Sequence, residues 1–192
     1  QVAADTKVIK YDGIAPDTVT LVRPTNYTDT NDQTVLLEWN TVTDTGLGVR
    51  YYIIEVDNDS LFASLNCSNT FSHPTAQITT SSLGSATYFW RVRSQDTAGN
   101  LGGWSDTRVF RIDTTAPDSP ANIIIYADLT APGTGVYIQW DTMAGDIKGY
   151  YIYRSTTYQN PIYSRISNTV TPASYLDTTV FSTNSYFYVV RA

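Results

Sequence analysis

Cysteine, histidine and methionine occur once each in the 192 residues, at Cys67, His73 and Met143. A single cysteine forms no disulfide within the chain, and one cysteine with one histidine cannot build a zinc cluster or a histidine pair for a transition metal. No nucleophile motif such as G-x-S-x-G surrounds His73, so we expect a loop histidine without a partner. The sequence therefore predicts no catalytic residues, no metal site and no cofactor.

Basic side chains and long apolar runs are also scarce. Lys and Arg number 12 against 18 Asp and Glu, which gives a formal net charge of −6. A chain without a basic stripe is not expected to bind nucleic acid or anionic lipid. Its longest apolar runs, such as 123–127, fall far short of the roughly 20 residues that span a bilayer, so no direct membrane insertion is expected. Because the chain begins with Gln1, we expect a processed product or an excerpt.

Good helix formers are rare, since Glu occurs twice and Lys three times, whereas Thr occurs 29 times and Tyr 15 times. β-branched and aromatic residues favour strands. The 42% apolar content is enough to close a core. We therefore predict an all-β protein of one or two domains.

An internal repeat divides the chain. Residues 5–17 read DTKVIKYDGIAPD and residues 106–118 read DTRVFRIDTTAPD, with seven of thirteen positions identical at an offset of 101. Near the other end of the repeat, YFWRVRS at 88–94 matches YFYVVRA at 186–192 at an offset of 98. A repeat of about one hundred residues has the length of a complete β-sandwich, and apolar residues at every second position predict strands with one buried face.

A Trp on the second strand, at Trp39 and Trp140, and a Tyr-x-x-x-Val sixth strand, at 88–92 and 186–190, resemble fibronectin type III domains. The strand endings and linkers, WSDTRVFRIDTTAPD and GYYIYRS, are similar to tandem repeats of prokaryotic cell-surface proteins. The resemblance implies tandem immunoglobulin-like β-sandwiches. It implies a spacer, an adhesin module or an accessory of a secreted enzyme, because this fold serves all three.

Four aromatic residues, Trp39, Trp140, Tyr88 and Tyr186, are candidates for a sugar-binding platform. Their alternation places them on the core-facing side of strands, and we interpret them as core. In the family resembled, a Trp at the start of the last strand packs across the end of the sandwich. We expect this role for Trp104, the alternative being exposure at a ligand or partner surface.

Asp residues in loops suggest calcium, which takes hard carboxylate and carbonyl oxygens. The candidates are Asp57 with Asp59, Asp96 with Asn100, and the linker residues Asp113 and Asp118. None has the spacing of an EF-hand or of a Gly-rich calcium repeat, and Asp often caps its own backbone in turns. We prefer the turn interpretation and leave calcium open.

Three N-x-Ser/Thr sequons begin at Asn26, Asn58 and Asn66, where glycans are possible on a surface protein. Cys67 lies inside the third sequon. We expect it to be a buried small hydrophobe, with an intermolecular disulfide as the alternative.

The repeat predicts three parts: residues 1–13 are the last strand of a preceding repeat with its linker, 14–113 are a complete domain, and 114–192 are a domain without its last strand. The second domain then has an open edge, and the first residues are a spare strand with no domain to complete. The expected interface residues are Lys7, Val8, Ile9, Lys10 and Tyr11 on the spare strand and Tyr186, Phe187, Tyr188, Val189, Val190 and Arg191 on the open edge.

Two arrangements satisfy these ends. Neighbouring repeats continue covalently in a longer array, or subunits join head to tail by β-strand addition. We predict a non-catalytic structural repeat of an extracellular array, such as a surface layer, sheath, filament or adhesin stalk, with neighbouring copies as partners. The alternative is an accessory module of a secreted carbohydrate-active enzyme. A receptor ectodomain is less favoured because the paired cysteines usual there are absent.

Overall fold

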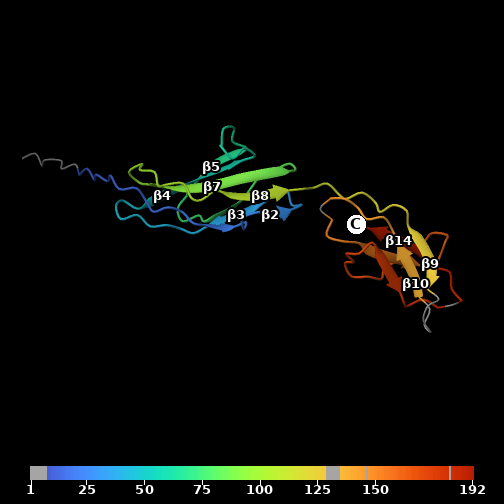
Figure 1. Ribbon diagram of the computed structural model, residues 1–192. Helices are drawn as coiled ribbons and strands as arrows, with labels where there is room; N and C mark the ends of the chain where they lie inside the picture. The colour runs from blue at the N-terminus through green and yellow to red at the C-terminus, as the bar shows by residue number, and fades with distance from the viewer. Residues whose placement is uncertain (1–7, 129–134, 146, 182) are drawn as a thin grey trace, which may run out of the picture. The chain divides into compact units, whose positions relative to one another are not determined.

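The computed structural model describes residues 8–128, 135–145, 147–181 and 183–192. Every regular element in this part of the chain is a β-strand (Figure 1). The strands fall into two compact units, one that ends at Thr115 and one that spans Ala116–Ala192. The all-β prediction is confirmed.

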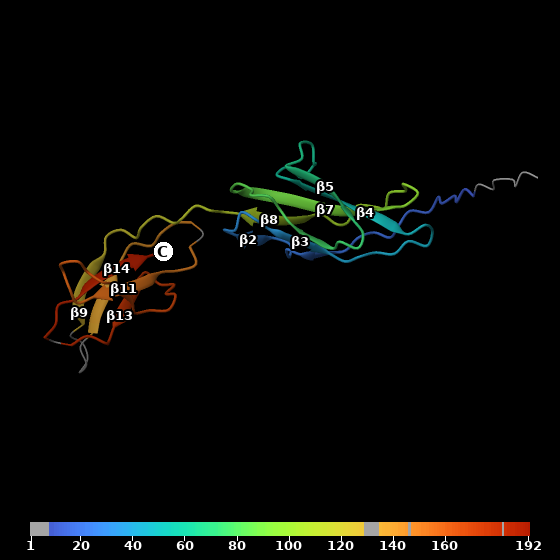
Figure 2. The ribbon, with the colours of Figure 1, turned by 180° about the vertical axis from the view of Figure 1, so that it is seen from behind.

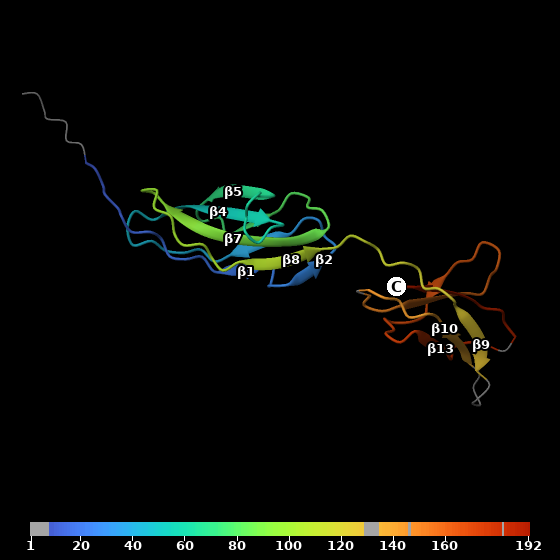
Figure 3. The ribbon, with the colours of Figure 1, turned by 45° about the horizontal axis from the view of Figure 1, so that its top comes forward.

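The first unit is a sandwich of two sheets. One sheet has the order β1-β3-β6 and contains β1 (Leu21–Arg23), β3 (Leu36–Trp39) and β6 (Gln77–Thr79). The other has the order β2-β8-β7-β4-β5 and contains β2 (Thr28–Thr30), β8 (Arg108–Ile112), β7 (Ala86–Asp96), β4 (Val49–Asp57) and β5 (Cys67–Ser72). Figure 3 shows the strands of this larger sheet side by side.

The last strand of the first unit, β8, lies within the repeated segment 106–118. β8 pairs antiparallel with β7, with Phe110 opposite Tyr88 and Val109 opposite Phe89. Its other edge pairs in parallel with the short strand β2. Each edge of β8 is therefore covered, so β7 and β8 both lie inside the sheet.

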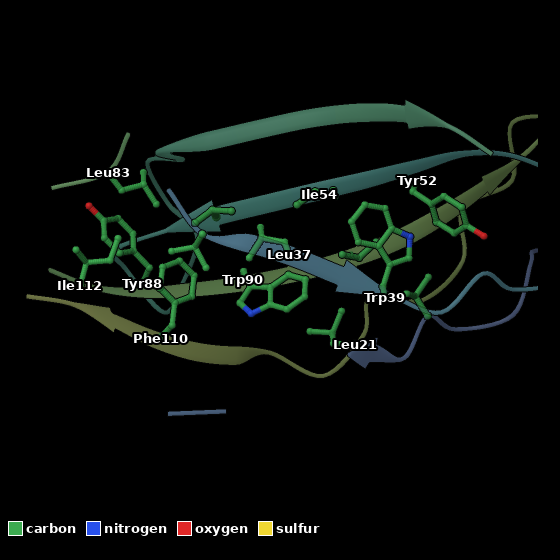
Figure 4. Packing of buried hydrophobic residues seen from close by; sticks show 14 residues of the cluster. Leu21, Leu37, Trp39, Tyr52, Ile54, Leu83, Tyr88, Trp90, Phe110 and Ile112 are labelled. Atoms are coloured by element: carbon green, nitrogen blue, oxygen red, sulfur yellow. The ribbon is translucent and has the colours of Figure 1, made fainter. Parts of the chain in front are cut away.

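The predicted alternation places large side chains between the two sheets. Leu37 and Trp39 on β3 and Trp90 on β7 are almost completely buried (Figure 4). Trp39 meets Tyr52 edge to face, with ring centroids 5.8 Å apart. The cluster consists of Val19, Leu21, Val35, Leu37, Trp39, Tyr52, Ile54, Val56, Leu83, Tyr88, Trp90, Val92, Phe110 and Ile112.

The second unit repeats this plan with fewer strands. One sheet has the order β13-β10-β9 and contains β13 (Ser174–Asp177), β10 (Gly135–Gln139) and β9 (Ile124–Asp128). The other has the order β12-β11-β14 and contains β12 (Ser164–Arg165), β11 (Tyr151–Ser155) and β14 (Phe187–Arg191) (Figure 2). Its buried cluster is Ile138, Trp140, Tyr150, Ile152 and Val190. Trp140 meets Tyr150 edge to face at 5.1 Å, as Trp39 meets Tyr52.

β14 corresponds in the repeat to β7 but has one partner instead of two. It pairs with β11, with Ile152 opposite Val190. Within the residues that the structure describes, no strand pairs with its other edge. Among the described residues, the second unit therefore shows no counterpart of β8, and the prediction that this domain lacks its last strand stays a prediction.

Candidate functional site

The open edge of β14 carries side chains that are half-buried where their counterparts in β7 are buried. Tyr186 and Tyr188 correspond to Tyr88 and Trp90, both of which lie in the first core. The Tyr186 hydroxyl accepts a hydrogen bond from the backbone N–H of Phe181 at 2.8 Å. The edge is thus held in place by its own unit while its backbone groups face no described strand.

The described residues of the predicted spare strand, 8–11, are exposed to solvent. Lys7 lies outside the described residues, and residues 8–11 form no strand. Val8, Ile9 and Tyr11 are 80%, 92% and 93% exposed. In Figure 1 this blue segment extends away from the first sandwich. Three of these four residues thus carry large apolar side chains that are exposed to solvent, and their role at an interface stays a prediction.

Asp12 fixes the end of this segment on the first unit. Its Oδ2 accepts a hydrogen bond from the backbone N–H of Leu47 at 2.6 Å, and its carbonyl accepts one from Nδ2 of Asn100 at 3.0 Å. Gly46 lets the carboxylate approach this closely, because a Cβ there would displace the Asp12 side chain from its present position. Residues 8–11 therefore project from a defined point on the loops of the first unit.

Asp12 also completes an acidic cluster. One carboxylate oxygen each from Asp12, Asp44 and Asp96 lies within 4.8 Å of the others. Burial opposes ionisation of Asp96, but hydrogen bonds from the Asn100 side chain and from the backbone N–H groups of Asn100 and Gly99 lower its pKa. Converging carboxylates of this kind are what a hard divalent cation takes as ligands.

The sequence found part of this cluster. It paired Asp96 with Asn100, and the structure brings both together. It missed Asp12 and Asp44, because three loops far apart in the sequence supply the carboxylates. The preferred turn interpretation accounts for the hydrogen bonds: Oδ1 of Asp96 accepts two backbone N–H groups at 2.7 Å, and Oδ2 of Asp44 accepts those of Gly46 and Gly48.

The other acidic candidates cap turns. Oδ2 of Asp57 accepts the N–H of Ser64 at 3.2 Å, and Oδ1 of Asp59 accepts that of Leu61 at 3.0 Å. Oδ1 of Asp113 accepts the N–H of Thr115 at 2.9 Å. These bonds satisfy backbone donors in loops, as Asp does in turns generally. Asp118 is exposed.

Trp104 lies on the outer face of a sheet rather than across the end of the sandwich, and its alternative role at a ligand or partner surface stays a prediction. Its half-buried ring lies between two guanidinium groups on the outer face of the larger sheet, 4.2 Å from Arg91 and 4.3 Å from Arg93. Arg91 also lies 4.0 Å from the Phe62 ring and donates to Glu55 at 2.7 Å. Arg91 and Arg93 alternate with buried neighbours and so face outward, where cation–π contacts hold the indole. We name Phe62, Arg91, Trp104 and Arg93 the arginine–aromatic ladder.

The expectation for His73 is wrong, since its Nδ1 lies 3.2 Å from the Tyr52 hydroxyl. That hydroxyl also accepts a hydrogen bond from the backbone N–H of Val42, and the imidazole tautomer sets which of Tyr52 and His73 donates to the other. The histidine therefore closes a hydrogen-bond chain at the edge of the core. Cys67 is half-buried against the first core, as a small hydrophobe would be.

The three sequon asparagines are exposed. Asn26 accepts from the backbone N–H of Val109 at 2.8 Å, and Asn66 accepts from that of Asn58 at 2.7 Å. Glycans at these positions stay a prediction.

A buried polar cluster in the second unit was not predicted. Arg154 and the Tyr188 hydroxyl both donate to Oδ2 of Asp177, at 2.7 and 2.9 Å. Burial disfavours the charged carboxylate, but hydrogen bonds from Thr179, Arg154 and Tyr188 lower the pKa of Asp177. Burial and the Asp177 carboxylate raise the pKa of Tyr188. The available signal was Arg154 itself, which falls in the repeat on the core residue Val56.

Comparisons with known proteins agree with this architecture. No family model matches the chain. An alignment over 121 positions is 36% identical to exoglucanase B of Cellulomonas fimi, and it covers 56% of this chain and 10% of that protein. The chain therefore spans about a tenth of the length of this curated relative. No helix in the described part of the chain is long and apolar enough to cross a membrane.

Among solved structures, the chicken CNTN1 FN1–FN3 domains superpose with a TM-score of 0.54 at 15% identity, over 96% of this chain and 64% of that one. The neighbour is composed of fibronectin type III domains, and its strand arrangement covers nearly the whole of the present chain. The chain thus has the fold of tandem fibronectin type III β-sandwiches.

Proposed function

We propose that the chain is a non-catalytic spacer repeat of an extracellular multidomain protein. The observation that carries this proposal is where its large aromatic residues are. Trp39 and Trp140 are buried in the two cores and do not form an exposed platform. A sandwich whose sheets are filled in this way supplies length and stiffness rather than a binding cleft.

Within that role, an array such as a surface layer, sheath, filament or adhesin stalk fits the chain best. The repeat extends over nearly all its length, and the linker sequence APD occurs at the same place in each copy. Pro has a fixed backbone angle and holds the residue before it in extended backbone, so a short linker that contains Pro is stiff. Regular spacing is the property that such arrays require.

The proposal is tested with the whole chain. Screens with glycoside, peptide and ester substrates are expected to stay at background, and insoluble polysaccharides are expected to retain none of the protein. Pulling the chain from its two ends should give two separate unfolding events, one for each unit. Turnover that a single substitution such as His73→Ala abolishes would contradict the proposal.

A second candidate is an accessory module of a secreted carbohydrate-active enzyme, and the match to exoglucanase B favours it. The two candidates differ in what else the native polypeptide contains. The intact mass and peptide map of the parent protein distinguish them: further copies of this repeat support the array, and a large catalytic domain supports the accessory module.

A further inference from the structure

We propose that the outer face of the larger sheet in the first unit, around Arg93 and Trp104, binds the acidic cluster of a second copy of this chain. The acidic cluster consists of Asp12, Asp44 and Asp96, and the two copies exchange the contact across a twofold axis. This inference names a partner for the proposed spacer and rests on that function for its biological meaning. Two groups of opposite charge carry it, and neither has a counter-charge among the described residues of its own copy.

The positive group is Arg93, a half-buried cation. It forms no ion pair within the part of the chain that the structure describes, and its Nε–H is buried without an acceptor. The neighbouring Arg91, by contrast, is paired with Glu55 at 2.7 Å. The Trp104 ring lies 4.3 Å from the Arg93 guanidinium, and this cation–π contact favours one orientation of the side chain. A guanidinium that is already oriented loses little conformational entropy when it binds a carboxylate.

The negative group is the acidic cluster. Its three carboxylates converge within 4.8 Å, and no described Lys or Arg forms an ion pair with any of them. Backbone N–H groups and the Asn100 amide stabilise the charge of Asp96, whereas Oδ1 of Asp44 is buried without a hydrogen-bond donor. Carboxylates this close repel one another, so a cation that approaches the cluster is attracted by all of them.

The positions of the two groups make the surface self-complementary. Arg93 and Asp96 both lie near the end of β7, roughly 10 Å apart along the strand. A positive and a negative group side by side can each face the opposite group of an identical copy when a twofold axis relates the copies. The same contact then forms twice, and the assembly closes as a dimer.

The side chains around Arg93 are of the types that interfaces favour. On β4, Ile53 lies opposite Arg93 and Tyr51 lies opposite Gln95, and both are half-buried. Trp104 adjoins them from the loop before β8. Aromatic residues and arginine are enriched at the centres of interfaces. An ion pair that forms among such side chains is also screened less than one in open solvent.

A second copy is favoured over an acidic polysaccharide as the occupant of this surface. A polysaccharide that reached Arg93 would also meet the acidic cluster at the end of the same strand, and its own carboxylates would be repelled there. A copy of this chain brings carboxylates to Arg93 and, at the same time, brings a cation to the acidic cluster.

Sedimentation with exchanged charges tests the contact. The unmodified chain should associate with increasing concentration, at least about tenfold more weakly in about 0.5 M than in about 0.05 M salt. Arg93→Glu and Asp12→Lys, each alone, should weaken association at least about tenfold, because each brings a side chain of like charge into the contact. An equimolar mixture of the two variants should associate to within about threefold of the unmodified chain, since each new charge then faces its opposite.

The matched control is Arg165→Glu, which changes an exposed arginine of the second unit and the net charge by the same amount. It should leave association within about twofold. A monomer at all concentrations, association that salt does not weaken, a mixture that does not recover, or an equal loss in the control would overturn the proposal.

NMR of the unmodified chain adds a measurement that does not depend on the variants folding. The indole N–H signal of Trp104 should shift with protein concentration, whereas that of Trp140, which is buried in the second unit, should not. Soluble polygalacturonate added to the dilute chain should leave the Trp104 signal in place. A Trp104 signal that is independent of protein concentration, or one that responds to the polysaccharide instead, would refute the dimer. The activity and pulling assays above report on single chains, so the two proposals fail separately.

Discussion

In the first unit fourteen described side chains form one buried cluster, whereas the buried cluster of the second unit has five. The positions of Val56 and Trp90 in the first core are taken in the second unit by Arg154 and Tyr188, which bind the buried carboxylate of Asp177. One repeat pattern therefore yields two kinds of interior. The first is closed by β8 and is apolar, whereas in the second no described strand takes the place of β8 and hydrogen bonds hold part of the interior.

The largest expected effect comes from equivalent isoleucines in the two cores. Ile54 and Ile152 occupy the same repeat position and are both 0% exposed. Ile54→Ala should lower the free energy of unfolding of the first unit by about 3–4 kcal/mol, since a tightly packed site collapses little around the cavity. Ile152→Ala should cost the second unit about 1 kcal/mol less, because fewer buried side chains surround it.

Denaturant unfolding followed by the amide NMR signals of each unit measures both costs. Ile124→Ala, at an exposed position, is the matched control and should change either value by less than about 0.5 kcal/mol. Equal costs for the two buried isoleucines would show that the two cores are packed alike.

The next effect concerns the polar cluster of the second unit. Arg154→Met removes the cationic partner of Asp177 and leaves a carboxylate without a counter-charge at a site that is 1% exposed. Because the Arg154 side chain is itself partly exposed, we expect a loss of about 2–3 kcal/mol. The double substitution Arg154→Met with Asp177→Leu should recover most of it, since a well-packed apolar pair replaces a buried ion pair at little cost. Failure of the double variant to recover would mean that the cluster also specifies the packing.

The same cluster makes the second unit sensitive to acid. The pKa of Asp177 is lowered from the ordinary value of 3.8, so the folded state binds its proton more weakly than the unfolded state does. Its contribution to stability is present above pH about 4 and is lost as pH falls through the folded-state pKa. Thermal unfolding between pH 7 and 2 should show the second unit losing stability below pH 4. Asp177→Asn should flatten that part of the profile, and an unchanged profile would rule the carboxylate out.

The alternation of apolar and polar residues in the sequence predicted which side chains face the core. Trp39 and Ile54 lie in strands and Trp140 directly follows β10, where every second residue faces the core, so their burial agrees with the spacing of apolar residues. The repeated segment 106–118 also contains the last strand of the first unit, β8 (Arg108–Ile112).

The contacts that could not be predicted join loops to one another or join a loop to the outer face of a sheet. The acidic cluster joins Asp12 to Asp44 and Asp96, and His73 meets Tyr52, through loop conformations that have no period. Trp104 was expected to pack at the end of the sandwich, but its ring makes cation–π contacts with two arginines on the outer face. Such contacts depend on which loop approaches which strand, and spacing within one segment carries no information about that.

The smallest expected effect compares the outer faces of the two units. In the first, Arg93 lies 4.3 Å from the Trp104 ring within the arginine–aromatic ladder, whereas in the second its repeat equivalent Arg191 lies 5.4 Å from the Tyr153 ring. An exposed cation–π contact is worth about 0.5–1 kcal/mol and weakens with distance. Arg93→Met should therefore destabilise the first unit by about 1 kcal/mol and Arg191→Met the second by less than about 0.5 kcal/mol. A double-mutant cycle of Arg93→Met with Trp104→Leu isolates the contact from the apolar stem, and a coupling energy near zero would mean that Trp104 is held by packing against the arginine stems rather than by their charge.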